Sequence, residues 1–179
     1  GAGQHRDRVR GRRARHGVVH ERAEVLGVGL VEVPQAVDDR VGLAGAVVVE
    51  PGLDRSFRGE LRPISERWIP EALAVSGFSR AQTLGFDDAA STMQAFVAWL
   101  SGLGGDAPRF VSDNNGFDWQ FVNWYLHHFV GRNPFGHSST NLGSLYKGLV
   151  KDMRQNFKHL RRTAHTHDPV DDALASLEE

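Results

Sequence analysis

The stretch that most constrains this chain runs from residue 112 to residue 128 and reads SDNNGFDWQFVNWYLHH. A short apolar run at residues 109–111 predicts a strand, and polar residues at 113–116 interrupt it. From Phe117 onward an apolar period of 3.6 residues predicts a helix that is apolar on nearly every side. Such a helix is buried, so we expect the rest of the chain to pack around it.

A single carboxylate, that of Asp118, lies in the first turn of this expected helix among aromatic residues. A carboxylate in apolar surroundings is costly unless it is paired or binds a metal ion. A strand, a polar turn and an acid at the start of a central helix therefore indicate a place that can hold a cation. The alternative is that Asp118 only stabilises the helix N-terminus through the macrodipole.

Composition narrows the class of protein. The 179 residues suffice for one domain with a proper core, and 21 basic residues nearly balance 22 acidic ones, so no global field demands a nucleic-acid or membrane partner. The chain has no cysteine, which leaves oxygen and nitrogen as its possible metal ligands. No apolar run could span a bilayer, and the Arg-rich start is not followed by the apolar region of a signal peptide. We therefore expect a soluble cytoplasmic protein.

Residues 1–55 are built from a reduced alphabet of Gly, Ala, Gln, His, Arg, Asp, Val, Glu, Leu and Pro. These are the types whose codons can begin with G or C, as expected when a GC-rich gene is read one base out of register. We therefore expect residues 1–44 to be an anomalous Arg/Gly/Val-rich segment in the wrong frame, and residues 45–179 to form the domain, its last helix cut short. The alternative is a disordered basic arm for nucleic acid, given seven Arg among the first 22 residues.

From residue 46 onward the pattern predicts ordinary elements. Residues 46–50 suit a strand, residues 56–61 suit its hairpin partner, and residues 71–76 suit a short helix. Asp87 or Asp88 is expected to cap the next helix. The core face of that helix is predicted to comprise Met93, Phe96, Val97 and Leu100.

Two further elements are expected near the end of the chain. Residues 131–140, GRNPFGHSST, predict a loop, either an ordinary connection or a cover over a site. A helix from Asn141 is expected to turn four apolar residues inward: Leu145, Leu149, Val150 and Met153. If that helix continues through Asn156, a basic stripe follows one face, either solvated or suited to a phosphate backbone, and it comprises Lys147, Lys151, Arg154, Lys158 and Arg161.

Two spaced motifs resemble those of a known superfamily. Asn114-x-x-Phe117-Asp118, followed by His167-x4-Asp172, resembles the second and third motifs of the DEDDh 3′–5′ exonucleases. That superfamily includes ribonuclease T, oligoribonuclease and polymerase proofreading domains. The runs WIPEAL at 68–73 and HDPVDDA at 167–173 are similar to those of its small 3′–5′ exoribonucleases.

The resemblance implies an α/β fold of the ribonuclease-H-like kind, with a mixed sheet flanked by helices. It implies hydrolysis of single-stranded nucleic acid from 3′ ends by two Mg²⁺ or Mn²⁺ ions, with RNA favoured over DNA. Asp118 and Asp172 would be metal ligands, because two-metal hydrolysis needs hard anionic oxygen ligands. His167 would be the general base, and Asn114 and Phe117 would contact substrate.

The resemblance leaves neighbouring residues as weaker choices. Asp171 could replace Asp172 as the ligand, but a spacing of five from His167 favours Asp172. His165 is likewise the second choice for the general base. Homodimers are common among such proteins, so a homodimer is a further expectation.

One departure from the family pattern is large. The family's first motif, Asp-x-Glu on the opening strand, occurs nowhere in this sequence. Residues 8–14, RVRGRRA, are compatible in the neighbouring frame with DLEADGP, but Arg8 and Arg10 as written cannot ligate a cation. We therefore expect poor metal affinity and impaired activity. The alternative from another class is a non-catalytic nucleic-acid-binding module with the same fold.

Overall fold

The computed structural model describes residues 25–28, 31–33, 41–44, 47–49, 54–104, 107–160, 170–171 and 173–174. Seven strands and five α-helices lie in these ranges, with a short π-helical segment and a short 3₁₀ helix. Among the helices found there, none has the length and apolar character needed to cross a membrane.

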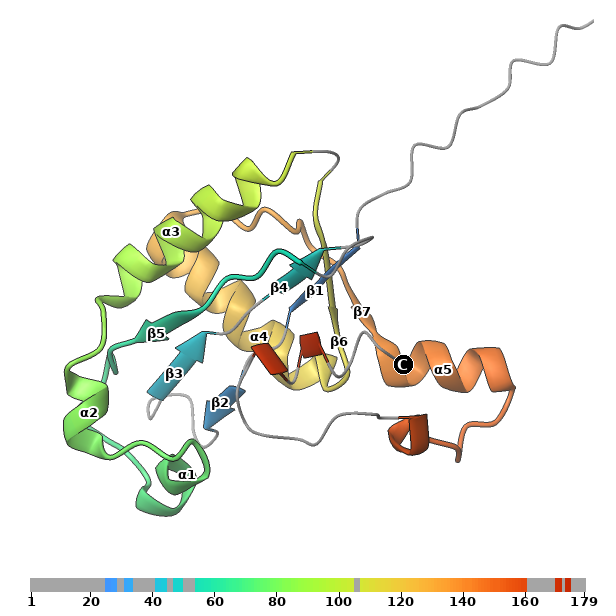
Figure 1. The fold of residues 1–179 in the computed structure, drawn as a ribbon, viewed down its shortest axis with the longest axis horizontal. Coiled ribbons are helices and arrows are strands. Elements are labelled where there is room, and N and C mark those ends of the chain that lie inside the picture. The colour runs from blue at the N-terminus through green and yellow to red at the C-terminus, as the bar shows by residue number, and fades with distance from the viewer. Residues whose placement is uncertain are drawn as a thin grey trace, which may run out of the picture.

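A four-stranded mixed sheet forms the centre of the molecule, in the order β4-β1-β6-β7 (Figure 1). Its strands are β1 (Val25–Val28), β4 (Val47–Val49), β6 (Arg109–Ser112) and β7 (Ser139–Asn141). β1, β6 and β7 run parallel, whereas β4 pairs antiparallel with β1. The mixed sheet flanked by helices that the resemblance implies is therefore present, and β6 is the strand predicted before the central helix.

A second, three-stranded antiparallel sheet has the order β2-β3-β5. It comprises β2 (Val31–Val33), β3 (Val41–Ala44) and β5 (Gly59–Leu61). The predicted hairpin between residues 46–50 and 56–61 is wrong, because β4 pairs with β1 and β5 pairs with β3. A local turn signal does not specify which sheet edge a strand will find, and tertiary packing decides it. β1, β2 and β3 all lie within residues 1–44, whose origin in a shifted frame stays a prediction.

The helices begin where capping residues permit. They are α1 (Pro70–Val75), α2 (Arg80–Leu84), α3 (Ala89–Gly102), α4 (Asn115–Tyr125) and α5 (Leu142–Val150). Asp88 caps α3 as predicted, since its Oδ2 accepts a hydrogen bond from the Ser91 amide at 3.0 Å. α2, which was not predicted from the sequence, begins with a reciprocal capping box between Ser79 and Gln82.

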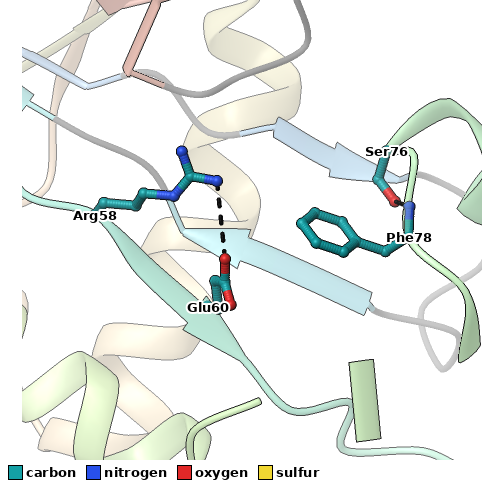
Figure 2. A network of polar contacts seen from close by, with 4 residues as sticks. All are labelled: Arg58, Glu60, Ser76 and Phe78. Carbon is teal, nitrogen blue, oxygen red and sulfur yellow. Dashed lines mark hydrogen bonds and ion pairs between the residues drawn. The ribbon is translucent and has the colours of Figure 1, made fainter. Parts of the chain in front are cut away.

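Hydrogen bonds of Ser76 fix the turn between α1 and α2, from which the Phe78 ring packs on Phe86. Ser76 Oγ donates to the Leu73 carbonyl at 2.7 Å and accepts from the Phe78 amide at 3.4 Å, and Gly77 adopts a φ of +75°. Figure 2 shows Ser76 beside the Phe78 amide. The Phe78 ring meets Phe86 edge-on, with centroids 5.1 Å apart.

Figure 2 also shows the ion pair between Arg58 and Glu60 at strand β5, with Nη2 and Oε1 3.7 Å apart. The side chains of Arg58 and Glu60 are 45% and 37% exposed. Solvent screens such a pair, so it adds little to stability.

The core lies between the two longest helices and strands β5 and β6. All four residues of the predicted α3 face are buried, namely Met93, Phe96, Val97 and Leu100. Phe110 of β6 and Leu126, just after α4, are 0% exposed. The Phe110 ring lies 5.1 Å from that of Trp119 and 5.5 Å from that of Phe135. The central helix is thus held by aromatic packing against the strand that precedes it.

The end of the chain differs from its prediction in three ways. Residues 139–140, expected in a loop, belong to β7. α5 ends at Val150, because Lys151 adopts a left-handed φ of 56°, so no continuous helix carries the basic stripe. The four apolar residues expected to face inward are exposed instead: Leu145 (51%), Leu149 (73%), Val150 (39%) and Met153 (76%). Periodicity identifies an apolar face but does not say what lies opposite it.

The core assignment predicts unequal effects of two identical substitutions. Leu126→Ala should lower the free energy of unfolding by about 2–5 kcal/mol, because it leaves a cavity beside buried side chains. Leu84→Ala, at a residue that is 52% exposed, should change it by less than about 0.5 kcal/mol. Urea unfolding followed by circular dichroism measures both, and equal effects would contradict this packing.

Candidate active site

The corner between β6 and α4 positions the candidate site. The carbonyl oxygen of Asn114 accepts hydrogen bonds from the amides of Phe117 at 2.8 Å and Asp118 at 3.0 Å. These bonds start the helix, although the Asn114 side chain makes no capping bond. The first turn of α4 therefore lies directly after the carboxyl end of β6, where the sequence analysis expects a cation.

Asp118 is a buried carboxyl with only 6% of its surface exposed. The pKa of Asp118 is raised from 3.8 to about 7, chiefly because burial desolvates the carboxylate. A hydrogen bond with the Ser112 side chain lowers the pKa, and the nearby charge of Asp113 contributes a smaller rise. Ser112 is itself 4% exposed. The helix-dipole explanation alone does not account for this burial, because a carboxylate can interact with a helix N-terminus at the surface.

The amide side chains of Asn115 and Asn141 link the turn after β6 to the neighbouring parallel strand β7. Asn115 Nδ2 donates to the Thr140 carbonyl at 3.2 Å, and Asn115 Oδ1 accepts from Ser139 Oγ at 2.8 Å. Asn141 Nδ2 donates to the Asp113 carbonyl at 3.1 Å. These bonds fix the turn that holds Asp118 to β7, so the site is tied to the sheet from two sides.

The residues expected to contact substrate lie at the surface of the same turn. Asn114 is exposed, and Phe117 is half-buried. The Phe117 ring meets that of Phe121 edge-on, with centroids 4.9 Å apart. Both are accessible beside Asp118, and their role in substrate binding stays a prediction.

The expected general base and second acid, His167 and Asp172, lie outside the described residues, as does His165. On either side of Asp172 the described chain is helical, at residues 170–171 and 173–174. Ala173 is buried at 3% exposure, whereas Asp171 is exposed. The convergence of Asp172 and His167 on Asp118 therefore stays a prediction.

The strand beside β6 carries no acid. β1 runs parallel to β6, with Leu26 level with Phe110 and Gly27 level with Val111, and its sequence is VLGV. In the superfamily that this chain resembles, the opening strand carries Asp-x-Glu. Residues 8–14, where the neighbouring frame is compatible with this motif, lie outside the described residues, so the strand that would carry the motif stays a prediction.

The oxygen donors near Asp118 are of the kind that a hard divalent cation prefers, but too few of them lie in the described residues to form a metal site. Asp118 and its neighbours Ser112 and Asp113 offer oxygen atoms, as Mg²⁺ and Mn²⁺ prefer. Within the described ranges, however, no three His, Asp or Glu side chains come together as a metal site would require.

Four polar residues of the site were not singled out from the sequence: Ser112, Asp113, Asn115 and Asn141. Ser112 could have been found, since it lies two residues after the buried Phe110 on the same strand and so shares its face. Asn115 and Asn141 could not, because their role depends on the pairing of β6 with β7 across an intervening helix.

Comparisons with known proteins show what this chain is similar to. No family model matches the chain. The curated 3′-5′ DNA exonuclease Cap18 of Escherichia coli is 34% identical over 113 residues, which are 61% of this chain and 59% of Cap18. Over this stretch the chain is similar to a 3′–5′ exonuclease. It spans about three-fifths of the length of the curated relative that it matches.

Solved structures of nucleases share the fold of this chain. Cell-death related nuclease 4 (CRN-4) matches with a TM-score of 0.65 at 16% identity, over 87% of this chain and 62% of that one. The zinc-bound complex of E. coli ExoI with single-stranded DNA matches with a TM-score of 0.68 at 12% identity, over 88% and 39%. At such identities the likeness concerns the fold alone, a mixed α/β exonuclease architecture of the ribonuclease-H-like kind.

The raised pKa of Asp118 predicts how stability depends on pH in metal-free buffer. Between pH 4 and pH 7 the folded protein holds a proton that the unfolded chain has lost, so the free energy of unfolding should fall as pH rises through this range. The loss attributable to this group is up to about 4 kcal/mol, at 1.36 kcal/mol per pKa unit. Asp118→Asn should therefore be more stable than the parent at pH 8 and similar to it at pH 4.

Denaturant unfolding at pH 4, 6 and 8 in the presence of a chelator measures this difference. Asp87→Asn is the matched control, because Asp87 is exposed and should show no such pH-dependent gain. A stability difference between Asp118→Asn and the parent that is the same at all three pH values would contradict the burial of this carboxyl.

Proposed function

We propose that this fold serves 3′–5′ exonucleolytic hydrolysis of single-stranded DNA, and that the printed sequence is impaired because it lacks the Asp-x-Glu pair. The observation that carries the proposal is Asp118, a buried carboxyl at the carboxyl ends of parallel strands in an exonuclease fold. β1, which pairs with β6 in the sheet, contributes no acid.

Burial of this carboxyl supports a cation-binding role. A lone ionised group in such a place is costly, and a second acid, Asp113, raises that cost. A divalent cation would offset both effects, because it favours the ionised form of each acid. Selection for stability alone would favour an amide or apolar residue at position 118, so the acid is better explained by a ligand.

The remaining roles follow from the motif spacing. Asp172 would hold the metal together with Asp118, and His167 would take a proton from the attacking water. Bound Mg²⁺ or Mn²⁺ supplies activation of that water and stabilisation of the leaving oxygen. Asn114 and Phe117, accessible at the start of α4, would contact the terminal nucleotide.

DNA replaces RNA as the proposed substrate. The RNA preference expected from the sequence gains no support from the comparisons, since the curated relative is named a DNA exonuclease. The ExoI structure with the same fold is likewise a complex with single-stranded DNA. RNA stays the alternative that an assay must include.

A second function is favoured by the acid-free strand. Without the Asp-x-Glu pair the same surface could bind single-stranded nucleic acid and leave it intact. This non-catalytic module predicts binding that does not depend on Mg²⁺ or Mn²⁺.

A cleavage assay on end-labelled single-stranded DNA and RNA separates the two functions. It compares the printed chain with a version in which residues 1–44 are replaced by the translation of the neighbouring frame. The replaced version should shorten DNA stepwise from the 3′ end with Mn²⁺, and the printed chain should be slower by on the order of 10²-fold or more, because it lacks metal-bridging acids.

In the active version, Asp118→Ala should abolish shortening and Asp87→Asn should not. Binding without cleavage in both versions would favour the module instead. Cleavage by the printed chain at the rate of the replaced version would show that the missing motif is not needed.

A further inference from the structure

Apart from the Arg-rich start of the chain, net positive charge gathers in one short region that the proposed catalytic site does not use. All three lysines of the chain, Lys147, Lys151 and Lys158, lie within twelve residues, and Arg154 lies between them. Asp152 is the one acid in residues 142–160, in a chain whose formal net charge is −1. This region is therefore a local basic patch on a nearly neutral protein.

The structure leaves these charges open to solvent. Lys151, Arg154 and Lys158 are exposed, and Lys147 is half-buried. In the part of the chain that the structure describes, no carboxylate forms an ion pair with any of them. Charges held in this way remain available to a polyanion.

The chain after α5 turns back along the helix, and this brings the patch toward the candidate site. Phe157 is 8% exposed, and its ring meets that of Tyr146 at a centroid distance of 6.2 Å. Tyr146 Oη lies 3.3 Å from His159 Nε2, which fixes the returning segment. Figure 1 shows α5 at the edge of the molecule beside β7.

The beginning of α5 lies next to the turn that holds Asp118. A Cβ added to Gly143 would lie 3.4 Å from Phe157 Cε1 and 4.0 Å from the Asp113 carbonyl oxygen. Lys158, the neighbour of Phe157, is therefore at the end of α5 nearest the site. Lys151 is at the other end, about 13 Å away along a nine-residue helix.

The same stretch of chain also carries exposed apolar side chains. Leu145, Leu149 and Met153 are 51%, 73% and 76% exposed, and no residue of α5 is buried. A second copy packed symmetrically on this face would bring like charges together, which disfavours a homodimer through it. A single strand of DNA suits this surface better. Its phosphates can pair with the lysine and arginine side chains, and its flat nucleobases can cover the exposed leucines.

We propose that the exposed residues of α5 and of the segment that follows it bind the backbone of single-stranded DNA on the 5′ side of the nucleotide at Asp118. This surface, called the α5 lysine face, comprises Leu145 and Leu149 of α5 with Lys151, Arg154 and Lys158 after it. The proposal rests on the proposed function for the position of the 3′ end. Binding itself needs no metal ion and no hydrolysis, so it can be measured in the printed chain.

Amine footprinting tests the proposal directly, because every lysine of the chain lies in residues 147–158. The printed chain is acetylated in chelator-containing buffer, alone and with oligothymidylate of about 20 nucleotides or of about 3, the longer exceeding a typical single-strand site. Mass spectrometry should show Lys151 and Lys158 modified several-fold more slowly with the long oligonucleotide than with the short one. Equal modification with and without a saturating long oligonucleotide would overturn the proposal.

Salt dependence provides a second readout with a matched control. Lys151→Gln combined with Lys158→Gln should lower the slope of log Kd against log salt by about 1.4, since each contact to a single strand contributes about 0.7. Arg109→Gln combined with Arg132→Gln removes two exposed charges elsewhere and should leave the slope nearly unchanged. Equal slopes for the two double variants would overturn the proposal. So would slower acetylation of the lysines when only the protein concentration is raised and no oligonucleotide is added.

The outcomes also separate this proposal from the proposed function. Cleavage by the frame-replaced version together with unprotected lysines would reject the α5 lysine face and keep the exonuclease. Protected lysines without cleavage in either version would keep the face and favour the non-catalytic module.

Discussion

The structure depends on one constraint, which is that a carboxyl is buried where an aromatic helix meets the end of a central strand. Asp118 is held there by the turn after β6, by the Ser112 side chain and by the packing of the helix on Phe110. The aromatic contacts stabilise the helix whether or not the acid is ionised. The acid therefore costs stability near neutral pH, and the cation that we propose for this site would offset that cost.

The local part of this arrangement was predictable from sequence. The apolar period after Phe117, the capping role of Asp88 and the buried face of α3 all follow from spacing, and the structure confirms them. Strand partners were not predictable in the same way: β5 pairs with β3 although a nearby turn signal suggested β4. The apolar side of α5 likewise obeys helical period and yet faces solvent, because period does not say what an element packs against.

In the candidate site, too, some features follow from neighbouring residues in the sequence and others depend on strand pairing. Burial of Asp118 could be inferred from its neighbours in sequence, but the amides of Asn115 and Asn141 belong to the site only because β7 pairs with β6. β1, which pairs with β6, carries no acid, and residues 8–14, the candidate for the missing motif, lie outside the described residues. The fold and the similarity to a 3′–5′ exonuclease agree with the family that the motif spacing resembles.

The central claim is that Asp118 shares one metal site with an acid from the third motif, far along the chain. A crystal structure of the chain soaked with Mn²⁺, with the ions located by anomalous scattering, tests it most directly. The account predicts that carboxylate oxygens of Asp118 and Asp172 reach the same ion or ion pair, which two-metal sites hold about 3.5–4 Å apart. Carboxylates of these two residues on opposite sides of the molecule would contradict it.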